Sequence, residues 1–255
     1  MMDEFYKKFY HLAPQSGVHA RFCERSFGHN LCQHGFADMA QLDAAITALQ
    51  LTPHHHLLDL GCGNGMIAEY ISDKTGAHVT GLDYMPEAIR QATVRTANKA
   101  DRLNFLVGDI NALDLRPASF DAILSIDTIY FSNDYTITIH QLKEALRPAG
   151  QMAFFYSYGL EPGMTIEDFP RETLEAAQTP LVKALRANDL NVTTLDLTAD
   201  DYRLAQLRKQ VLTELQPAFA AEDLMFIYEN RMGEATGISR SIEMGLHRRY
   251  LVVGY

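Results

Sequence analysis

The stretch that decides the fold reads Leu57-Leu58-Asp59-Leu60-Gly61-Cys62-Gly63-Asn64-Gly65. It is a short apolar run that stops at a cluster of three glycines, and a helix is expected to follow from about Met66. Glycine lets the backbone turn sharply and approach a ligand closely, and open α/β sheets bind ligands at the carboxyl ends of their strands. The pattern predicts a buried strand that ends in a ligand-binding loop. A tight strand-to-helix turn without a ligand would use the same glycines, so the surrounding residues must decide.

Acidic residues end the next two predicted strands, which span residues 77–82 and 103–107. Asp83 follows the first of them, 24 residues after Asp59, and Asp109 follows the second. A carboxylate in the first position can accept hydrogen bonds from both hydroxyls of a ribose. Asp109 is placed to accept from the exocyclic amine of an adenine. Each acid alone suits a solvated loop or a helix cap, but acids in register with a glycine loop favour a nucleotide-like ligand.

Strands and helices alternate from residue 55 to residue 157, whereas the first 50 residues look helical and contain no strand candidate. Apolar strands separated by helices imply a parallel sheet covered on both faces. The expected fold class is therefore α/β, a doubly wound, mostly parallel seven-stranded sheet. The expected parts are an N-terminal helical cap at 1–50, a core domain at 51–255 and a lid-like insertion after the fifth strand at about 159–189. The remaining strands are expected at 120–126, 151–156, 190–197 and 249–255, with helices at 87–99, 135–146, one within the insertion and two between 199 and 244.

These segments resemble the motifs of the class I S-adenosylmethionine-dependent methyltransferases. Residues 57–65 resemble the first motif, 79–87 the second and 108–110 the third, while 145–151 is similar to the turn before the fifth strand in small-molecule members. The resemblance covers residues 55–157 closely. It implies a Rossmann-like fold, S-adenosylmethionine as the cofactor and S-adenosylhomocysteine as its product.

The same resemblance assigns roles to individual residues. The glycine loop would pack under the methionine part of the cofactor, Asp83 would hold the ribose, and Asp109 with the Ile110 amide would read the adenine, which Tyr84 would flank. His34, in Gln33-His34-Gly35-Phe36, is similar to a segment that closes over the methionine end in some relatives, although a surface loop histidine is the alternative. The expected cofactor-binding residues are Asp59, Gly61, Gly63, Asp83, Tyr84, Asp109, Ile110, Ser125 and His34.

Two other functions compete with methyl transfer. An NAD(P)-dependent oxidoreductase would need a third glycine directly after Gly65, where this sequence has Met66, and Asp59 is also typical of the methyltransferase motif. A non-catalytic domain that binds S-adenosylmethionine to regulate a partner would use the same loop. The aromatic cap and the long insertion favour an enclosed substrate site over that alternative.

The acceptor pocket is expected outside the common core, and its predicted residues are Tyr6, Tyr10, Tyr130 and Tyr156. Aromatic walls suit a small acceptor that is partly apolar or carries an amine, although core packing explains each ring equally well. The fourth strand ends Asp127-Thr128-Ile129-Tyr130 rather than in the Pro-Pro signature of enzymes that methylate planar amines. Methyl transfer is a direct displacement, so no catalytic residue is assigned, and the acceptor atom (N, O or C) stays open.

Composition narrows the partners further. The 255 residues include 32 acidic and 22 basic side chains, a formal net charge of −10, which disfavours nucleic acid. No apolar run approaches the ~20 residues of a membrane span, and neither a signal peptide nor a disulfide framework is expected, so a cytoplasmic protein is predicted. The consecutive histidines 54–56 point to alternate faces of a strand entrance, so no metal site is expected.

Overall fold

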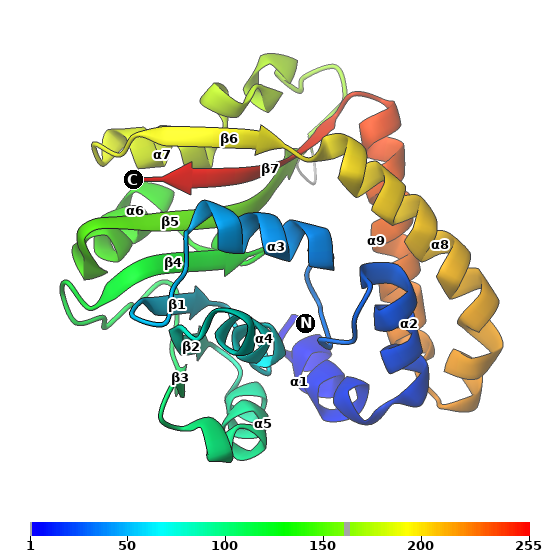
Figure 1. Cartoon of the computed structure of the whole chain (residues 1–255). Coiled ribbons are helices and arrows are strands. Elements are labelled where there is room, and N and C mark those ends of the chain that lie inside the picture. The colour runs from blue at the N-terminus through cyan, green and yellow to red at the C-terminus, as the bar shows by residue number, and fades with distance from the viewer. Residues whose placement is uncertain (1, 161–163) are drawn as a thin grey trace. The chain divides into compact units, whose positions relative to one another are not determined.

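The computed structural model describes residues 2–160 and 164–255 and divides into two compact units (Figure 1). We call residues 40–156, 180–195 and 251–255 the sheet unit. Residues 1–39, 157–179 and 196–250 make up the helical unit. The units are described separately. The predicted division into a cap and a core stays a prediction.

The sheet has seven strands in the order β3-β2-β1-β4-β5-β7-β6, which confirms the predicted Rossmann-like topology. Strands β1 to β5 pair in parallel, while β7 runs in the opposite direction (Figure 1). Right-handed crossovers place the helices that lead from β1 to β2 and β3 on one face and the helix between β4 and β5 on the other. The strands are β1 (His56–Leu60), β2 (His78–Asp83), β3 (Leu103–Val107), β4 (Phe120–Ile126), β5 (Leu146–Gly159), β6 (Val192–Asp196) and β7 (His247–Gly254).

Strand β5 is longer than the sequence pattern predicted, since it begins at Leu146 rather than at residue 151. Phe120 pairs with Leu146 whereas Ala122 pairs with Gln151, so residues 147–150 form an irregular bulge within the strand. The residue types of Arg147-Pro148-Ala149-Gly150 favour a turn, and in the structure this segment is the bulge between the paired residues Leu146 and Gln151.

The helices of the sheet unit begin and end at residues that explain their limits. Pro86 occupies the first turn of α5, where its missing N–H costs nothing. The Asp134 carboxylate caps α6 by accepting from the Thr136 and Ile137 amides. The predicted helix 87–99 is α5 followed by a 3-10 turn. The elements are α3 (Met39–Ala48, with Met39 in the other unit), α4 (Met66–Thr75), α5 (Pro86–Arg95), η2 (Ala97–Lys99), η3 (Ile129–Phe131), α6 (Tyr135–Ala145) and α7 (Pro180–Ala187).

The helical unit contains the N-terminal helices and the long pair near the C-terminus, as the sequence predicted. Ser16 caps α2 by accepting from the His19 amide, and Glu222 at the end of α8 accepts from the Ser16 hydroxyl and the Val18 amide. These bonds join α2 to α8. The elements are α1 (Met2–Leu12), η1 (Ala13–Gln15), α2 (Gly17–Phe27), η4 (Arg171–Leu174), η5 (Ala176–Gln178), α8 (Thr198–Ala221) and α9 (Met225–Glu243). The predicted insertion 159–189 includes residues 161–163, which lie outside the described residues.

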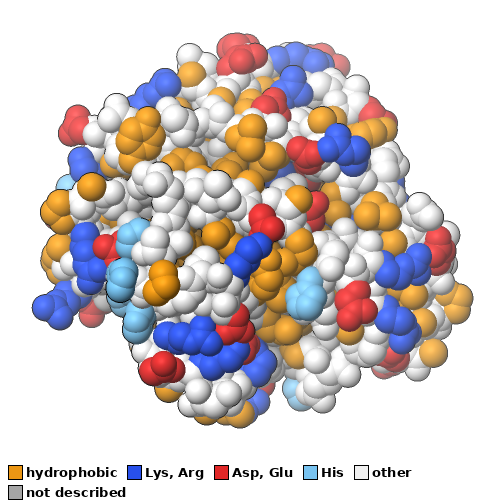
Figure 2. Space-filling model, in the orientation of Figure 1, with side chains coloured by type: hydrophobic (Ala, Val, Ile, Leu, Met, Phe, Trp, Pro, Cys, Tyr) orange, Lys and Arg blue, Asp and Glu red, His pale blue; other side chains and the backbone are white. Residues whose placement is uncertain are grey.

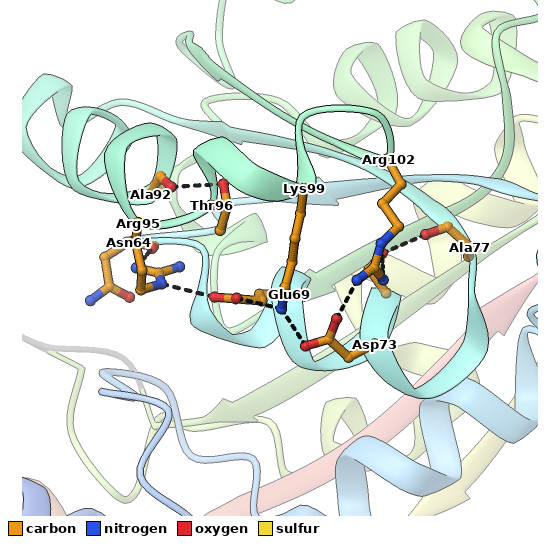
Figure 3. Close-up of polar contacts among 10 residues, drawn as sticks. Asn64, Glu69, Asp73, Ala77, Ala92, Arg95, Thr96, Lys99 and Arg102 are labelled. Atoms are coloured by element: carbon orange, nitrogen blue, oxygen red, sulfur yellow. Dashed lines mark hydrogen bonds and ion pairs between the residues drawn. The ribbon is translucent and has the colours of Figure 1, made fainter.

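A network of ion pairs joins α4 to the segment that follows α5 (Figure 3). The Glu69 carboxylate accepts from Arg95 at 2.8 Å and Lys99 at 2.7 Å, and Asp73 accepts from Lys99 and Arg102, both at 2.6 Å. Burial raises the pKa of Glu69, but the hydrogen bonds from Lys99 and Arg95 outweigh it and leave that pKa below its ordinary value. The network therefore fixes α4 against the start of β3.

Acidic and basic side chains alternate over the visible surface, with no continuous basic patch on that face (Figure 2). Within residues 2–160 and 164–255, no helix has the length and apolarity needed to cross a membrane.

Candidate functional site

The glycine loop after β1 has a backbone conformation that residues with a Cβ rarely adopt. Gly61, Gly63 and Gly65 have φ of 82°, 55° and 73°, the left-handed region that favours glycine. The Gly61 amide donates to the Leu82 carbonyl at 2.7 Å, which holds the loop against the end of β2. A Cβ on Gly61 would lie 2.1 Å from Oγ1 of Thr128. Thr128 was not predicted as a site residue, because only the fold brings it next to Gly61.

Asp83 connects the end of β2 to this loop. Its Oδ2 accepts from the Gly63 amide at 2.8 Å and its Oδ1 from the Met85 amide at 2.9 Å. Burial raises the pKa of Asp83, whereas these two amides lower it. A carboxylate offers about four acceptor positions, so both oxygens keep capacity for donors from a ligand.

Asp59 is a buried acidic residue on β1. Its side chain is buried, and its Oδ2 has no hydrogen-bond partner. Burial, with a smaller contribution from the nearby Asp83 charge, raises the pKa of Asp59 to about 7. The Ser125 hydroxyl is also buried without a partner, and the register pairs Asp59 with Leu124, one residue before Ser125 on β4. Unpartnered buried polar atoms are costly, so their presence at one sheet edge indicates a site for a polar ligand.

Strand β3 brings the third predicted segment to the same edge. Asp109 Oδ1 accepts from the Asn111 amide at 2.8 Å, and the Asn111 side chain donates to the Phe131 carbonyl at 2.9 Å. Asn111 was not predicted, although an Asp-x-Asn turn after a strand is its signal. Ile110 is buried, and Tyr84 after β2 is 57% exposed. The predicted residues Asp59, Gly61, Gly63, Asp83, Tyr84, Asp109, Ile110 and Ser125 thus all lie in the sheet unit, on β1, β2 and β4 or directly after β1, β2 and β3.

Arg95 supports the glycine loop from α5. Its Nη1 donates to the Asn64 carbonyl at 2.8 Å while its Nε contacts Glu69 (Figure 3). The ion-pair network on α4 therefore also fixes the loop.

The remaining predicted residues belong to two groups. His34, Tyr6 and Tyr10 lie in the helical unit, where the His34 residue is partly buried, its Nε2 is buried, and its ring centroid is 4.9 Å from that of Tyr6. Tyr130 and Tyr156 lie in the sheet unit and stack with centroids 5.5 Å apart, with Tyr156 buried.

A separate hollow of about 370 Å³ lies at the amino ends of β1 and β2. Its lining includes the histidines 54–56 and 78 together with Arg102 and Arg147. The His56 ring contacts the Thr80 hydroxyl at 2.8 Å. Among the residues that the structure describes, no group of histidine, cysteine or acidic side chains is arranged to hold a metal ion.

Comparison with known proteins agrees with this geometry. Residues 58–154 match the model of a methyltransferase domain family. The chain is 31% identical over 146 residues to a 27-O-demethylrifamycin SV methyltransferase of Amycolatopsis mediterranei (strain S699), covering 52% of this chain and 53% of that protein. It is 30% identical over 146 residues to phosphoethanolamine N-methyltransferase 1 of Zea mays, covering 57% and 28%. The chain thus spans about half or less of the length of these relatives.

Solved structures share the fold across nearly the whole chain. Phosphoethanolamine N-methyltransferase 2 of Haemonchus contortus superposes with a TM-score of 0.77 at 17% identity, over 98% of this chain and 60% of that one. The cyclopropane synthase MmaA2 of Mycobacterium tuberculosis gives 0.72 at 17% identity, over 98% of both chains. At this identity the likeness concerns the fold alone.

Proposed function

We propose that the chain carries a class I methyltransferase domain and that the protein is an enzyme that transfers a methyl group from S-adenosylmethionine to a small-molecule acceptor. One observation supports this most strongly, the buried Asp59 side chain beside the glycine loop, whose Oδ2 has no hydrogen-bond partner. Relatives of known activity that share the domain include methyltransferases of small molecules, such as those for rifamycin and phosphoethanolamine.

The charges of the sheet unit fit this cofactor. S-adenosylmethionine carries a sulfonium and an ammonium group against one carboxylate, so its net charge is positive. Asp59 is buried and Asp83 is partly buried at the same sheet edge, and burial raises the pKa of both. A cation beside them would offset the cost of burying their ionised forms.

Individual residues would then hold the parts of the cofactor. The spare acceptor positions of Asp83 suit the two ribose hydroxyls, and Asp109 with the Ile110 amide suits the adenine edge. The exposed ring of Tyr84 is available to flank the base. His34 stays a proposed ligand of the methionine end on sequence resemblance alone.

The cofactor supplies a methyl group that its sulfonium has already activated. The task of the protein is then to orient the acceptor and exclude water, which can lower the activation free energy by roughly 7–11 kcal/mol. The stacked rings of Tyr130 and Tyr156 are proposed as a wall of the acceptor site, and Tyr6 and Tyr10 stay candidates on the sequence pattern alone. The net charge of −10 supports a small molecule over a nucleic acid as the acceptor, and a cytoplasmic location is part of the same proposal.

Calorimetric titration tests the cofactor. We expect S-adenosylmethionine and S-adenosylhomocysteine to bind at micromolar strength, about −8 kcal/mol. Asp83→Ala should weaken binding by roughly 1.5–3 kcal/mol for each bond that it loses. Asp114→Asn, at an exposed position, is the matched control. Saturable binding of NAD with no heat from either S-adenosyl compound would refute the proposal in favour of an oxidoreductase.

Turnover separates an enzyme from a regulatory domain. A panel of small amines, carboxylic acids and phenols is incubated with S-adenosylmethionine, and release of S-adenosylhomocysteine is measured. We expect at least one acceptor to be methylated and none of tRNA, DNA or protein. Methylation of a macromolecule alone would contradict the small-molecule assignment, whereas binding without turnover on any acceptor would favour a regulatory role.

A further inference from the structure

Three arginines lie inside the helical unit, each almost fully buried. They are Arg208 on α8, Arg231 on α9 and Arg249 on β7. Burying a guanidinium is costly unless an acid pairs with it, so the acids around these groups decide what the cluster can do.

Arg249 has an acid of its own. Its Nε lies 4.0 Å from Asp201, which also contacts the His247 ring at 3.2 Å, and its Nη1 donates to the Ser157 hydroxyl. Arg249 and Asp201 therefore form an ion pair, in which one positive charge faces one negative charge.

Arg208 and Arg231 share Glu234, whose Oε2 accepts from Arg208 at 3.0 Å and lies 3.4 Å from Arg231. The Asp201 charge also acts on Arg208. The three guanidinium groups against the carboxylates of Asp201 and Glu234 leave the cluster with an excess of one positive charge. Burial lowers the pKa of Arg208 to about 10, with the Arg231 charge adding to that effect. A pKa of that size still leaves the guanidinium charged at neutral pH.

Three nitrogens of this neighbourhood are buried without a hydrogen-bond partner, namely Nε of Arg208, Nε of Arg231 and Nε2 of His34. The residues that carry them are neighbours: Arg231 donates through Nη1 to the His34 carbonyl and through Nη2 to the Gln33 carbonyl, both at 2.6 Å, and it shares Glu234 with Arg208. Burial, followed by the charges of Arg231 and Arg208, holds the pKa of His34 well below its ordinary value, so its ring is neutral. A neutral imidazole can donate one hydrogen bond without adding charge.

Apolar rings complete the surroundings of these nitrogens. The His34 ring contacts Phe5, Tyr6 and Phe9 with centroids 4.9–5.5 Å away. The guanidinium of Arg208 lies 4.7 Å from the Phe36 ring, and that of Arg231 lies 5.4 Å from Phe9. The neighbourhood thus combines N–H donors and one surplus positive charge with aromatic walls.

We propose that Arg208, Arg231 and His34 bind the carboxylate group of a small monocarboxylate with an apolar body. A carboxylate brings one negative charge, which matches the surplus, whereas a phosphate dianion would leave an unmatched negative charge inside the unit. Carboxylate oxygens accept from guanidinium and imidazole N–H groups, and the Glu234 carboxylate already shows that both guanidinium groups accept this partner.

The test uses benzoate as the probe, benzyl alcohol as its neutral counterpart and inorganic phosphate as the dianion. The full chain is titrated while the Nε–H resonances of its arginines are followed by NMR, with Arg208→Lys and Arg231→Lys used for assignment. We expect benzoate to shift the Arg208 and Arg231 resonances saturably, and neither of the other compounds to do so. Equal shifts with benzyl alcohol, stronger binding of phosphate, or no saturable shift with benzoate would each overturn the proposal.

Variants that change the charge of the cluster test its effect on benzoate binding. Arg208→Met should weaken benzoate binding at least about tenfold, because a hydrogen bond to a charged group is lost. Arg203→Met, on the exposed side of the same helix, is the control and should leave binding unchanged. Because Arg208→Met risks unfolding, Glu234→Gln gives an independent readout, since it increases the surplus charge and should tighten benzoate binding about tenfold. Unchanged or weaker binding in Glu234→Gln would contradict the inference.

Binding of S-adenosylhomocysteine is measured on the same samples. If that compound does not bind, the proposed function fails while the benzoate titration still decides the carboxylate site. If it binds and benzoate does not, only the carboxylate site is wrong.

Discussion

Replacing Asp59 by asparagine should stabilise the free protein and weaken its hold on the cofactor. In the folded chain burial and the Asp83 charge raise the pKa of Asp59 from 3.8 to about 7. The folded state therefore retains a proton that the unfolded chain releases above pH 3.8, so stability is lost as pH rises from about 4 to about 7. At about 1.4 kcal/mol per pH unit, the full elevation corresponds to roughly 4 kcal/mol. Asparagine has the same shape and carries no such penalty.

The assay is urea denaturation of wild type and Asp59→Asn between pH 5 and pH 8. The stability advantage of the variant should grow by about 3 kcal/mol over that range, because Asp59 titrates only in the wild type. Asp114→Asn, at an exposed position, should show no such trend. S-adenosylmethionine should bind the wild type more tightly as Asp59 ionises, while the variant should lose that pH dependence. A constant stability difference from pH 5 to pH 8 would refute the assignment of a protonated buried carboxyl.

Three further changes test other parts of the molecule. Gly61→Ala should destabilise the protein by at least about 2 kcal/mol, because its φ is +82° and its Cβ would meet Thr128, whereas Gly233→Ala in α9, where a Cβ has open space, should stabilise it by roughly 0.5–1 kcal/mol. Equal effects of the two in thermal denaturation would contradict the loop geometry. Burial, helped by the Arg231 charge, lowers the pKa of His19 to about 3, so its contribution to stability is present above pH 6.5 and is lost as pH falls. His19→Leu should therefore remove roughly 2 kcal/mol of the stability lost between pH 7 and pH 5, and an acid sensitivity equal to that of the wild type would show that this histidine is protonated in the fold. Glu69→Gln should cost about 1–2 kcal/mol at low ionic strength and less in 1 M NaCl, as measured by urea denaturation, because it removes two partly buried ion pairs. A cost that does not change with salt would point to packing instead.

The sequence alone was enough to predict the α/β class and the sheet edge that carries the candidate cofactor site. The signals are local, because a strand that ends in Gly61-Cys62-Gly63 and acids that follow neighbouring strands meet at one edge whenever the strands are parallel. The start of β5 at Leu146, with residues 147–150 as a bulge, was missed because the residue types of 147–150 favour a turn, and the pairing of Leu146 with Phe120 is a long-range property.

Only the tertiary structure decided which polar groups lack partners. Asp59 reads as an ordinary motif residue in the sequence, and its raised pKa exists because the fold surrounds it with apolar atoms and places Asp83 nearby. No role was predicted for Arg208, Arg231 or Glu234 from the sequence, yet α8 and α9 bury the two arginines, which share Glu234. A sequence specifies which charged residues are present. The free-energy cost of burying each charge depends on how far it is buried and on its neighbours from distant segments, and both are set only when the chain has folded.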